Sequence, residues 1–243
     1  MSDEVRYNPR EYAKTKTFPF RIDVERHTIF TLAGDVNGKR ILDGGCGEGI
    51  YARKFIDSGA AYVLGIDASQ DFINLAIQKN AGYEGRIDYQ HAFIQDTKGR
   101  ADMDIAVGSY LLSYPKNLEE AVAYCAAIAS HLKKDGTFVG FNNNPFDVFD
   151  GVRFKKYGFE KEMHGDQVGG EVIYRLQGLT EPITNYFLSH KIYEEAFRTA
   201  GFSRFNWRAV LRDKSSNAVK RSKSYWNEFF GGSPPFIAMV ATK

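Results

Sequence analysis

The chain has 243 residues, of which 43% are hydrophobic and 26% are charged, and its formal net charge is +2. This length fits one large α/β domain, or such a domain with an inserted cap, and can bury a sizeable core. The charge balance neither attracts nor excludes nucleic acid by itself. The first residues lack the apolar core of a signal peptide, and no run reaches the roughly 18 apolar residues of a membrane span. We therefore expect a cytoplasmic protein with no membrane partner.

The first 36 residues precede the alternating strand and helix signals and form the first of two candidate caps. Within them, residues 12–21 carry aromatic and basic side chains. Such a run can cover a ligand, or it can lie on the surface as a solvated amphipathic helix.

Residues 40–49 and 63–67 carry the strongest signal in the chain. A short apolar run ends in Asp43, and the glycine-rich turn that follows lets the backbone bend sharply and approach a ligand. The second run ends in Asp67, at about the spacing of 20 residues where a doubly wound sheet places an acid against ribose hydroxyls. The two signals together predict a nucleoside-cofactor site.

The spacing of the glycines argues against a dinucleotide and against a nucleoside triphosphate as the cofactor. A dinucleotide fingerprint has a glycine where this chain has Ile50, and no Gly-Lys-Ser or Gly-Lys-Thr follows to make a P-loop. Two alternatives stay open at this point: a turn that binds a different nucleoside, and a turn that binds nothing, with Asp43 as a helix cap.

Alternating strand and helix signals run through the rest of the chain and predict an α/β fold with a doubly wound, mostly parallel seven-stranded sheet. The expected strands begin at Ile41 and then cover residues 63–67, 87–93, 105–108, 137–141, 205–211 and 236–241. The expected helices cover residues 51–58, a segment capped by Ser69, residues 118–132 and a segment capped by Ser189.

Residues 146–186 are the second candidate cap. Residues 152–160 and 171–176 have the pattern of strands that turn near Gly169 and Gly170. Because additions after a strand's carboxyl end lie over the ligand crevice of an open α/β sheet, we expect this segment to select the substrate.

The pattern Asp43-x-Gly45-x-Gly47-x-Gly49 after a strand resembles the first motif of the class I S-adenosylmethionine-dependent methyltransferases, D-x-G-x-G-x-G. The resemblance implies a Rossmann-like methyltransferase fold that ends in an antiparallel hairpin. The resemblance spans about residues 38–243, and we expect a single methyltransferase domain over residues 1–243, with residues 1–36 as a lid and residues 146–186 as an inserted cap. It also implies S-adenosylmethionine as the cofactor and S-adenosylhomocysteine as the product.

Site residues follow from the same resemblance. Asp67 would accept hydrogen bonds from the ribose, the backbone around the glycine turn would face the methionine portion, and Ala68 would flank adenine. Many members carry an acid after the third strand, where this chain has Phe93, so either Phe93 stacks on adenine or Asp96 reaches in. The implied cofactor-binding residues are Tyr12, Phe20, Arg21, Asp43, Gly45, Cys46, Gly47, Asp67, Ala68, Phe93, Ser109 and Tyr110.

The lid and one strand edge are similar to those of small-molecule enzymes such as the azapteridine N-methyltransferase of toxoflavin biosynthesis. In this comparison Tyr12 and Phe20 would cover the cofactor, and Arg21 would bind the cofactor carboxylate or an acidic substrate. The run Asn142–Asn144 at the edge could bind a heterocycle or simply form a turn.

Methyl transfer from a sulfonium is an in-line displacement, so a close and aligned nucleophile supplies most of the acceleration. A ring nitrogen needs no base, whereas a phenol or alcohol usually needs one. The candidate catalytic residues are His27, Tyr114 and His164. Neither Cys46 nor Cys125 has the spacing of a metal cluster or a disulfide framework, so we expect reduced thiols and no metal.

The sequence thus predicts methyl transfer to a nitrogen or oxygen of a small aromatic or heterocyclic metabolite by a monomer or homodimer. A basic run over residues 204–223 supports the alternative of an RNA or protein methyltransferase, although a solvated loop explains it equally well and nucleic acid is an unlikely partner. A noncatalytic module that only binds S-adenosylmethionine is a further alternative.

Overall fold

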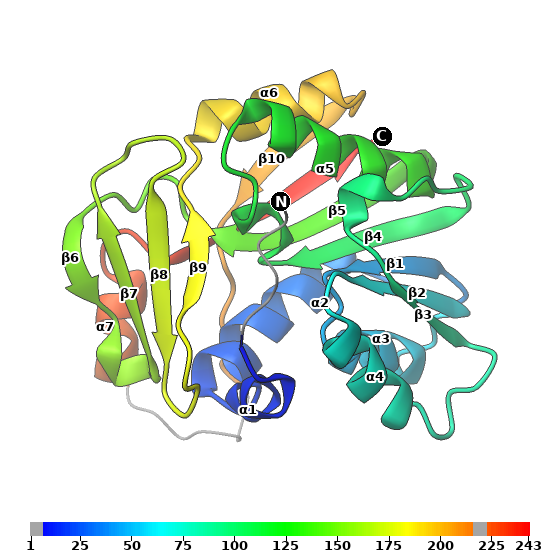
Figure 1. Cartoon of the computed structure of the whole chain (residues 1–243), viewed down its shortest axis with the longest axis horizontal. Coiled ribbons are helices and arrows are strands. Elements are labelled where there is room, and N and C mark those ends of the chain that lie inside the picture. The colour runs from blue at the N-terminus through cyan, green and yellow to red at the C-terminus, as the bar shows by residue number, and fades with distance from the viewer. Residues whose placement is uncertain (1–6, 216–222) are drawn as a thin grey trace.

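The computed structural model describes residues 7–215 and 223–243 and contains two sheets (Figure 1). The larger sheet consists of β1 (Arg40–Gly44), β2 (Tyr62–Asp67), β3 (Ile87–His91), β4 (Met103–Ser109), β5 (Leu132–Asn143), β10 (Arg204–Arg208) and β11 (Phe236–Thr242). Its seven strands run in the order β10-β11-β5-β4-β1-β2-β3. The neighbours from β5 to β3 are parallel, whereas β11 is antiparallel to both β5 and β10. The predicted doubly wound sheet with a final antiparallel hairpin is confirmed.

Helices cover both faces of this sheet, as Figure 1 shows. They are α2 (His27–Ala33), α3 (Ile50–Asp57) and α4 (Gln70–Gln78) on one face, and α5 (Leu118–His131) and α6 (His190–Thr199) on the other. The helices on both faces explain why β1 and β4 are almost continuously buried. The edge strand β10 alternates between exposed and half-buried residues instead.

The two predicted helix caps, Ser69 and Ser189, differ in how they cap their helices. The Ser69 hydroxyl accepts a hydrogen bond from the Phe72 amide and caps α4 as expected. Ser189 is the N-cap residue of α6 as expected, but its side chain makes no capping hydrogen bond. The first turn of α6 is closed by backbone hydrogen bonds to the Ser189 carbonyl.

The inserted segment, residues 146–186, forms the smaller sheet. Its antiparallel strands are β6 (Asp150–Arg153), β7 (Phe159–His164), β8 (Glu171–Leu176) and β9 (Ile183–Tyr186). The single strand expected over residues 152–160 is wrong. Phe154 and Gly158 both have left-handed φ values, 74° and 87°, and the 3-10 turn Lys155–Tyr157 between them separates β6 from β7.

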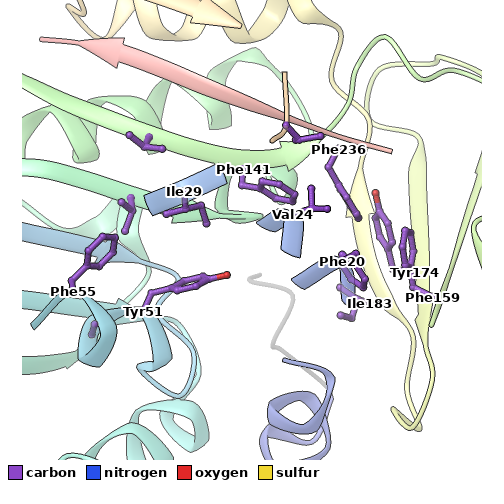
Figure 2. Close-up of a cluster of buried hydrophobic side chains, with 14 of the residues drawn as sticks. Phe20, Val24, Ile29, Tyr51, Phe55, Phe141, Phe159, Tyr174, Ile183 and Phe236 are labelled. Atoms are coloured by element: carbon purple, nitrogen blue, oxygen red, sulfur yellow. The ribbon is translucent and has the colours of Figure 1, made fainter. Parts of the chain in front are cut away.

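The amino-terminal segment lies between the two sheets. It contains α1 (Pro9–Thr15), a π-helix η1 (Arg21–Arg26) and α2. Figure 2 shows Phe20, Val24 and Ile29 between the α3 side chains Tyr51 and Phe55 and the small sheet, within one continuous apolar cluster. The lid segment is therefore part of the core that joins the two sheets.

No helix among the residues that the structure describes is both long enough and apolar enough to cross a membrane.

Candidate active site

The glycine turn is tied to the end of the neighbouring strand. The amides of Gly45 and Cys46 both donate to the Ile66 carbonyl, at 2.8 and 3.0 Å, and the Gly47 amide donates to Asp67 Oδ2 at 2.7 Å. Gly45 and Gly47 have φ values of 69° and 54°, a region that residues with a Cβ rarely adopt. The two strand ends that the sequence singled out therefore form one structural unit.

Asp67 is the residue for which the sequence predicts a ribose contact. Its Oδ1 also accepts from the Ser69 amide at 2.9 Å, so two backbone donors hold the carboxylate in place. Burial raises the pKa of Asp67, and these two amides oppose that shift. A carboxylate has about four lone-pair positions, so acceptor capacity remains for two ribose hydroxyls.

Residues expected around adenine lie beside this acid. The Ala68 carbonyl is 3.0 Å from His91 Nε2. Phe93 is half-buried where the chain leaves β3, whereas Asp96 is exposed. The partly buried Phe93 ring can stack on adenine. The exposed Asp96 is less suited to the interior of an adenine slot.

Asp43 is a buried acid at the end of β1. It is 2% exposed, and its Oδ2 has no hydrogen-bond partner among the described residues. Burial raises the pKa of Asp43 to about 7, although the Lys16 ammonium nearby opposes the shift. A positively charged ligand group such as the ammonium of an amino acid would favour the ionised form.

Aromatic residues of the lid reach the glycine turn through Phe72. The rings of Tyr7 and Tyr12 pack on Phe72 with centroid distances of 5.8 and 5.6 Å. A Cβ built on Gly47 would lie 3.7 Å from the same Phe72 ring. Tyr12, a predicted covering group, and Tyr7 therefore both contact the ring that lies against the glycine turn.

Phe20 lies elsewhere. Its ring packs on Phe159 of the small sheet at 4.7 Å and on Phe236 at 5.8 Å. It therefore joins the lid to the cap, and nothing in these contacts brings it to the glycine turn.

Glu25 of η1 is the centre of the polar contacts in the lid, and the sequence analysis missed it. Its side chain is fully buried and accepts five hydrogen bonds. The donors are Tyr51 Oη (2.6 Å), Arg21 Nη1 (2.9 Å), Ser109 Oγ (3.0 Å), Tyr110 Oη (3.0 Å) and Lys16 Nζ (3.3 Å). Burial alone would raise the pKa of Glu25, but Lys16 and Arg21 lower it to about 2. The Glu25 carboxylate is therefore ionised, and its oxygens are occupied by the five hydrogen bonds.

Ser109 and Tyr110 end β4 with an abrupt turn, because Tyr110 has a left-handed backbone with φ 62°. Their side chains are both held by Glu25. The sequence predicts that their backbone passes beside the methionine portion, and this stays a prediction.

A cavity that is partly open to solvent lies next to these residues. The lid, the end of β4, the small sheet and the start of β11 all contribute to its wall, and Figure 2 shows part of that wall. The lining residues are Tyr7, Tyr12, Phe20, Arg21, Tyr110, Tyr114, Phe159, Tyr174, Leu176, Ile183, Asn185 and Phe236. No Asp, Glu or His belongs to this described lining.

Of the three candidate bases, only Tyr114 lines the cavity. Its hydroxyl is 3.2 Å from that of Tyr7. Burial raises the pKa of both phenols, so they stay protonated and can donate hydrogen bonds but cannot take a proton near neutral pH. His27 begins α2 and His164 ends β7 with an exposed side chain beside Glu162. Neither histidine is part of the cavity wall.

The three asparagines at the end of β5 bind within the protein. Asn142 accepts from Ser113 Oγ at 2.6 Å and donates to the Tyr193 hydroxyl at 3.0 Å. Asn143 accepts from the Tyr174 hydroxyl, and Asn144 donates to the Pro234 carbonyl. These contacts support the interpretation as a structural turn over that of a heterocycle site.

The basic run gains no support from the described residues. Lys220 and Arg221 lie outside the residues that the structure describes. Arg212 lies over the Trp226 ring at 5.6 Å.

Comparisons with known proteins agree with this geometry. Residues 41–136 match the model of a methyltransferase domain family. The chain is 26% identical over 154 residues to an uncharacterized protein of Haemophilus influenzae, covering 60% of this chain and 59% of that protein. It is 30% identical over 122 residues to a ubiquinone biosynthesis O-methyltransferase of Bordetella bronchiseptica, covering 48% of each. The matches thus span about half the length of these curated relatives.

Among solved structures, the chain resembles an amino pentose methyltransferase from Micromonospora echinaspora that is involved in calicheamicin biosynthesis. The TM-score is 0.65 at 15% identity, and the match covers 100% of this chain and 99% of that one. At this identity the likeness shows the fold alone.

Residues 41–136 thus match a methyltransferase domain, and the sheet order and the glycine turn joined to Asp67 agree with the resemblance to the class I S-adenosylmethionine-dependent methyltransferases.

Proposed function

We propose that this chain transfers the methyl group of S-adenosylmethionine to a nitrogen or oxygen of a small aromatic or heterocyclic molecule. The observation that carries the proposal is the cavity between the lid, the end of β4 and the small sheet, whose wall is mainly aromatic. Small-molecule sites are lined predominantly by hydrophobic and aromatic side chains with a few polar groups. A planar acceptor can stack against such a wall.

The cofactor would be held by residues at the ends of three strands. Asp67 would bind the ribose, the turn over Gly45–Gly47 would follow the methionine portion, and Phe93 would flank adenine. When bound, the sulfonium supplies the methyl group and the driving force. We further propose that the methyl transfer uses no metal ion.

The protein's own contribution would be alignment and exclusion of water. Residues of the lid and the small sheet line the cavity. Because no described lining residue is an acid or a histidine, the acceptor atom must be a lone-pair nitrogen or an oxygen that is already ionised. Tyr114 and Tyr7 would orient the acceptor as hydrogen-bond donors. This revises the predicted role of Tyr114 from a base to a positioning group.

The small-molecule acceptor, the monomeric or homodimeric state and a cytoplasmic location belong to the same proposal. Cys46 and Cys125 are buried and unpaired, which suits a reducing compartment.

Calorimetric titration with S-adenosylmethionine, S-adenosylhomocysteine and NADH tests the cofactor first. We expect micromolar binding of the two sulfur nucleosides and none of NADH. A screen with radiolabelled S-adenosylmethionine against aromatic amines, heterocycles and acidic phenols then tests transfer. Binding of the cofactor without transfer to any acceptor would favour the noncatalytic module, and salt-sensitive RNA methylation would favour the nucleic-acid alternative. Failure of both sulfur nucleosides to bind would overturn the proposal.

A further inference from the structure

Asn185 is a buried amide on the face of the small sheet that lines the cavity. In β9, Ile183 and Asn185 are buried and line the cavity, whereas Thr184 and Tyr186 are half-buried. The strand register places Asn185 opposite Val172 of β8, whose side chain is fully buried. Because side chains alternate between the two faces of a strand, an apolar residue would be the ordinary choice at position 185. A polar side chain at this position therefore indicates a role beyond packing.

Most of the hydrogen-bonding capacity of the Asn185 amide is unused. Asn185 is 2% exposed, and the single hydrogen bond of its side chain among the described residues runs from Nδ2 to the Thr184 carbonyl at 3.3 Å. An amide has two N–H donors and an oxygen that can accept twice, so one donor and both acceptor positions stay unpaired with these residues. A buried polar group without a partner destabilises the folded chain. A molecule bound in the cavity would supply the missing partners.

Two other polar side chains on this face differ from Asn185, because each is held by the protein. The Tyr174 hydroxyl donates to Asn143 Oδ1 at 2.9 Å, and the Lys161 ammonium donates to Asp147 Oδ2 at 2.9 Å. Lys161 lies opposite Tyr174 in the strand register, so both belong to the same face. These contacts attach the small sheet to the end of β5 and to the segment after it. Of these three polar groups, Asn185 alone keeps both an unpaired donor and an unpaired acceptor for a molecule in the cavity.

We propose that Asn185 determines the acceptor specificity by binding the edge of a planar heterocycle in which a ring N–H lies next to a carbonyl, as in a lactam. This inference rests on the proposed function and narrows its acceptor to that class. A carboxamide presents a donor and an acceptor in one plane, and such an edge binds an adjacent acceptor and donor on a heterocycle. The aromatic wall would stack on the ring. The atom that receives the methyl group would lie elsewhere on the same molecule.

The first test uses the whole chain saturated with S-adenosylhomocysteine and two probes, 2-quinolone and 1-methyl-2-quinolone. The second probe keeps the ring and the carbonyl but lacks the N–H. We expect calorimetry to show that 2-quinolone binds at least about tenfold more tightly, because a site built to bind an N–H rejects the analogue without it. Asn185→Leu should reduce this preference to less than about twofold and change the affinity for S-adenosylhomocysteine by less than about threefold. Equal binding of the two probes to the unaltered chain, no binding of either probe, or an unchanged preference in Asn185→Leu would overturn the inference.

A stability measurement separates this role from a structural one. If the amide serves a ligand, Asn185→Leu should raise the melting temperature of the ligand-free chain by about 2–4 °C, because it removes an unpaired polar group from an apolar face. A lower melting temperature would mean that the amide stabilises the fold, and would contradict the inference. Thr184→Val, on the other face of β9, is the matched control and should leave the probe preference and the affinity for S-adenosylhomocysteine unchanged. Each contrary result leaves S-adenosylhomocysteine binding by the unaltered chain, and hence the proposed function, standing.

Discussion

Asp67 performs a structural task that is independent of any ligand, because its carboxylate connects the Gly47 and Ser69 amides. The proposed ribose contact uses the acceptor positions that remain. A substitution at this residue therefore tests both roles, and the ligand-free protein must be measured beside the complex.

Asp67→Asn replaces one carboxylate oxygen by an amide donor and removes the charge. We expect the affinity for S-adenosylhomocysteine to fall at least about tenfold, or roughly 1.4 kcal/mol. Calorimetry measures the affinity, and thermal unfolding without ligand shows whether the turn has survived. Asp71→Asn, an exposed position in the next helix, is the matched control. Unchanged affinity in Asp67→Asn would mean that the ribose lies elsewhere.

The residue scale also shows which parts of the site a sequence can reveal. Asp43 and Asp67 were found because each directly follows an apolar strand, so the signal is local. Glu25 was missed because its meaning depends on Tyr51, Ser109 and Tyr110, which are distant in the sequence and reach it only in the folded chain. Nothing next to Glu25 marks it as different from an acid on a solvated helix.

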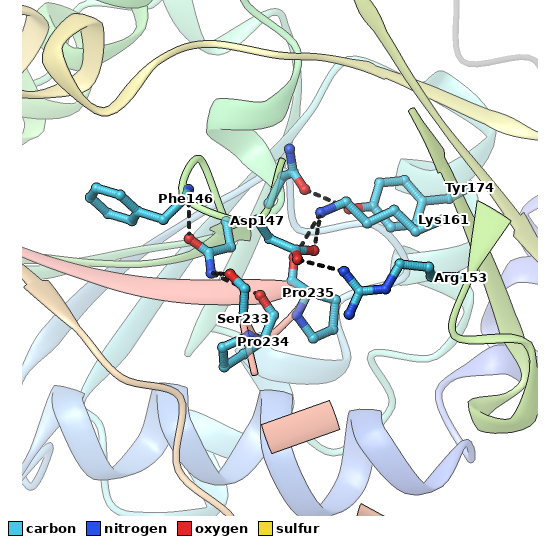
Figure 3. A network of polar contacts seen from close by, with 10 residues as sticks. Phe146, Asp147, Arg153, Lys161, Tyr174, Ser233, Pro234 and Pro235 are labelled. Atoms are coloured by element: carbon cyan, nitrogen blue, oxygen red, sulfur yellow. Dashed lines mark hydrogen bonds and ion pairs between the residues drawn. The ribbon is translucent and has the colours of Figure 1, made fainter. Parts of the chain in front are cut away.

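At the scale of elements, a buried ion pair attaches the small sheet to the large one (Figure 3). Lys161 of β7 is fully buried, and its ammonium donates to Asp147 Oδ2 at 2.9 Å. Asp147 lies in the segment after β5 and also binds Arg153 of β6 at 3.0 Å. The neighbouring Tyr174 and Phe236 line the cavity. The ion pair therefore holds the cap strands in register with the cavity wall.

Substitution of Asp147 should lower the free energy of unfolding more than substitution of Lys161. Asp147→Asn leaves Lys161 and Arg153 without their carboxylate, so we expect the free energy of unfolding to fall by about 3–5 kcal/mol. Lys161→Met leaves Asp147 paired with Arg153 and should cost less. Denaturant unfolding measures both, with Lys155→Met, an exposed lysine in the turn between β6 and β7, as the control. A larger loss in Lys161→Met than in Asp147→Asn would contradict the proposed arrangement.

The elements differ in how well the sequence predicts them. The central strands are buried on both faces, and a continuous apolar run marks them clearly. The cap strands are short, and the break between β6 and β7 depends on a left-handed Phe154, which no residue preference signals. β9 has only four residues and was not predicted at all.

At the scale of the whole molecule, two buried acids give the stability opposite dependences on pH. The pKa of Glu25 is lowered to about 2, so its contribution is present above its unfolded pKa of 4.5 and is lost as the pH falls toward 2. The pKa of Asp43 is raised to about 7, so the folded chain retains a proton that the unfolded chain releases. The contribution of Asp43 is therefore full below its unfolded pKa of 3.8 and is lost as the pH rises through 7.

Asp43→Asn should remove the second dependence, because an amide does not titrate. We expect the unaltered protein to lose stability relative to Asp43→Asn between pH 4.5 and 7.5, by on the order of 3 kcal/mol, since one pKa unit corresponds to about 1.4 kcal/mol. Urea unfolding across this range measures the difference, and Asp71→Asn should follow the unaltered protein throughout. Because an ammonium group near Asp43 would favour its ionised form, saturating S-adenosylhomocysteine should reduce the loss. If the curves for the unaltered protein and Asp43→Asn stay parallel, Asp43 is ionised in the folded state and the cation that compensates it belongs to the protein itself.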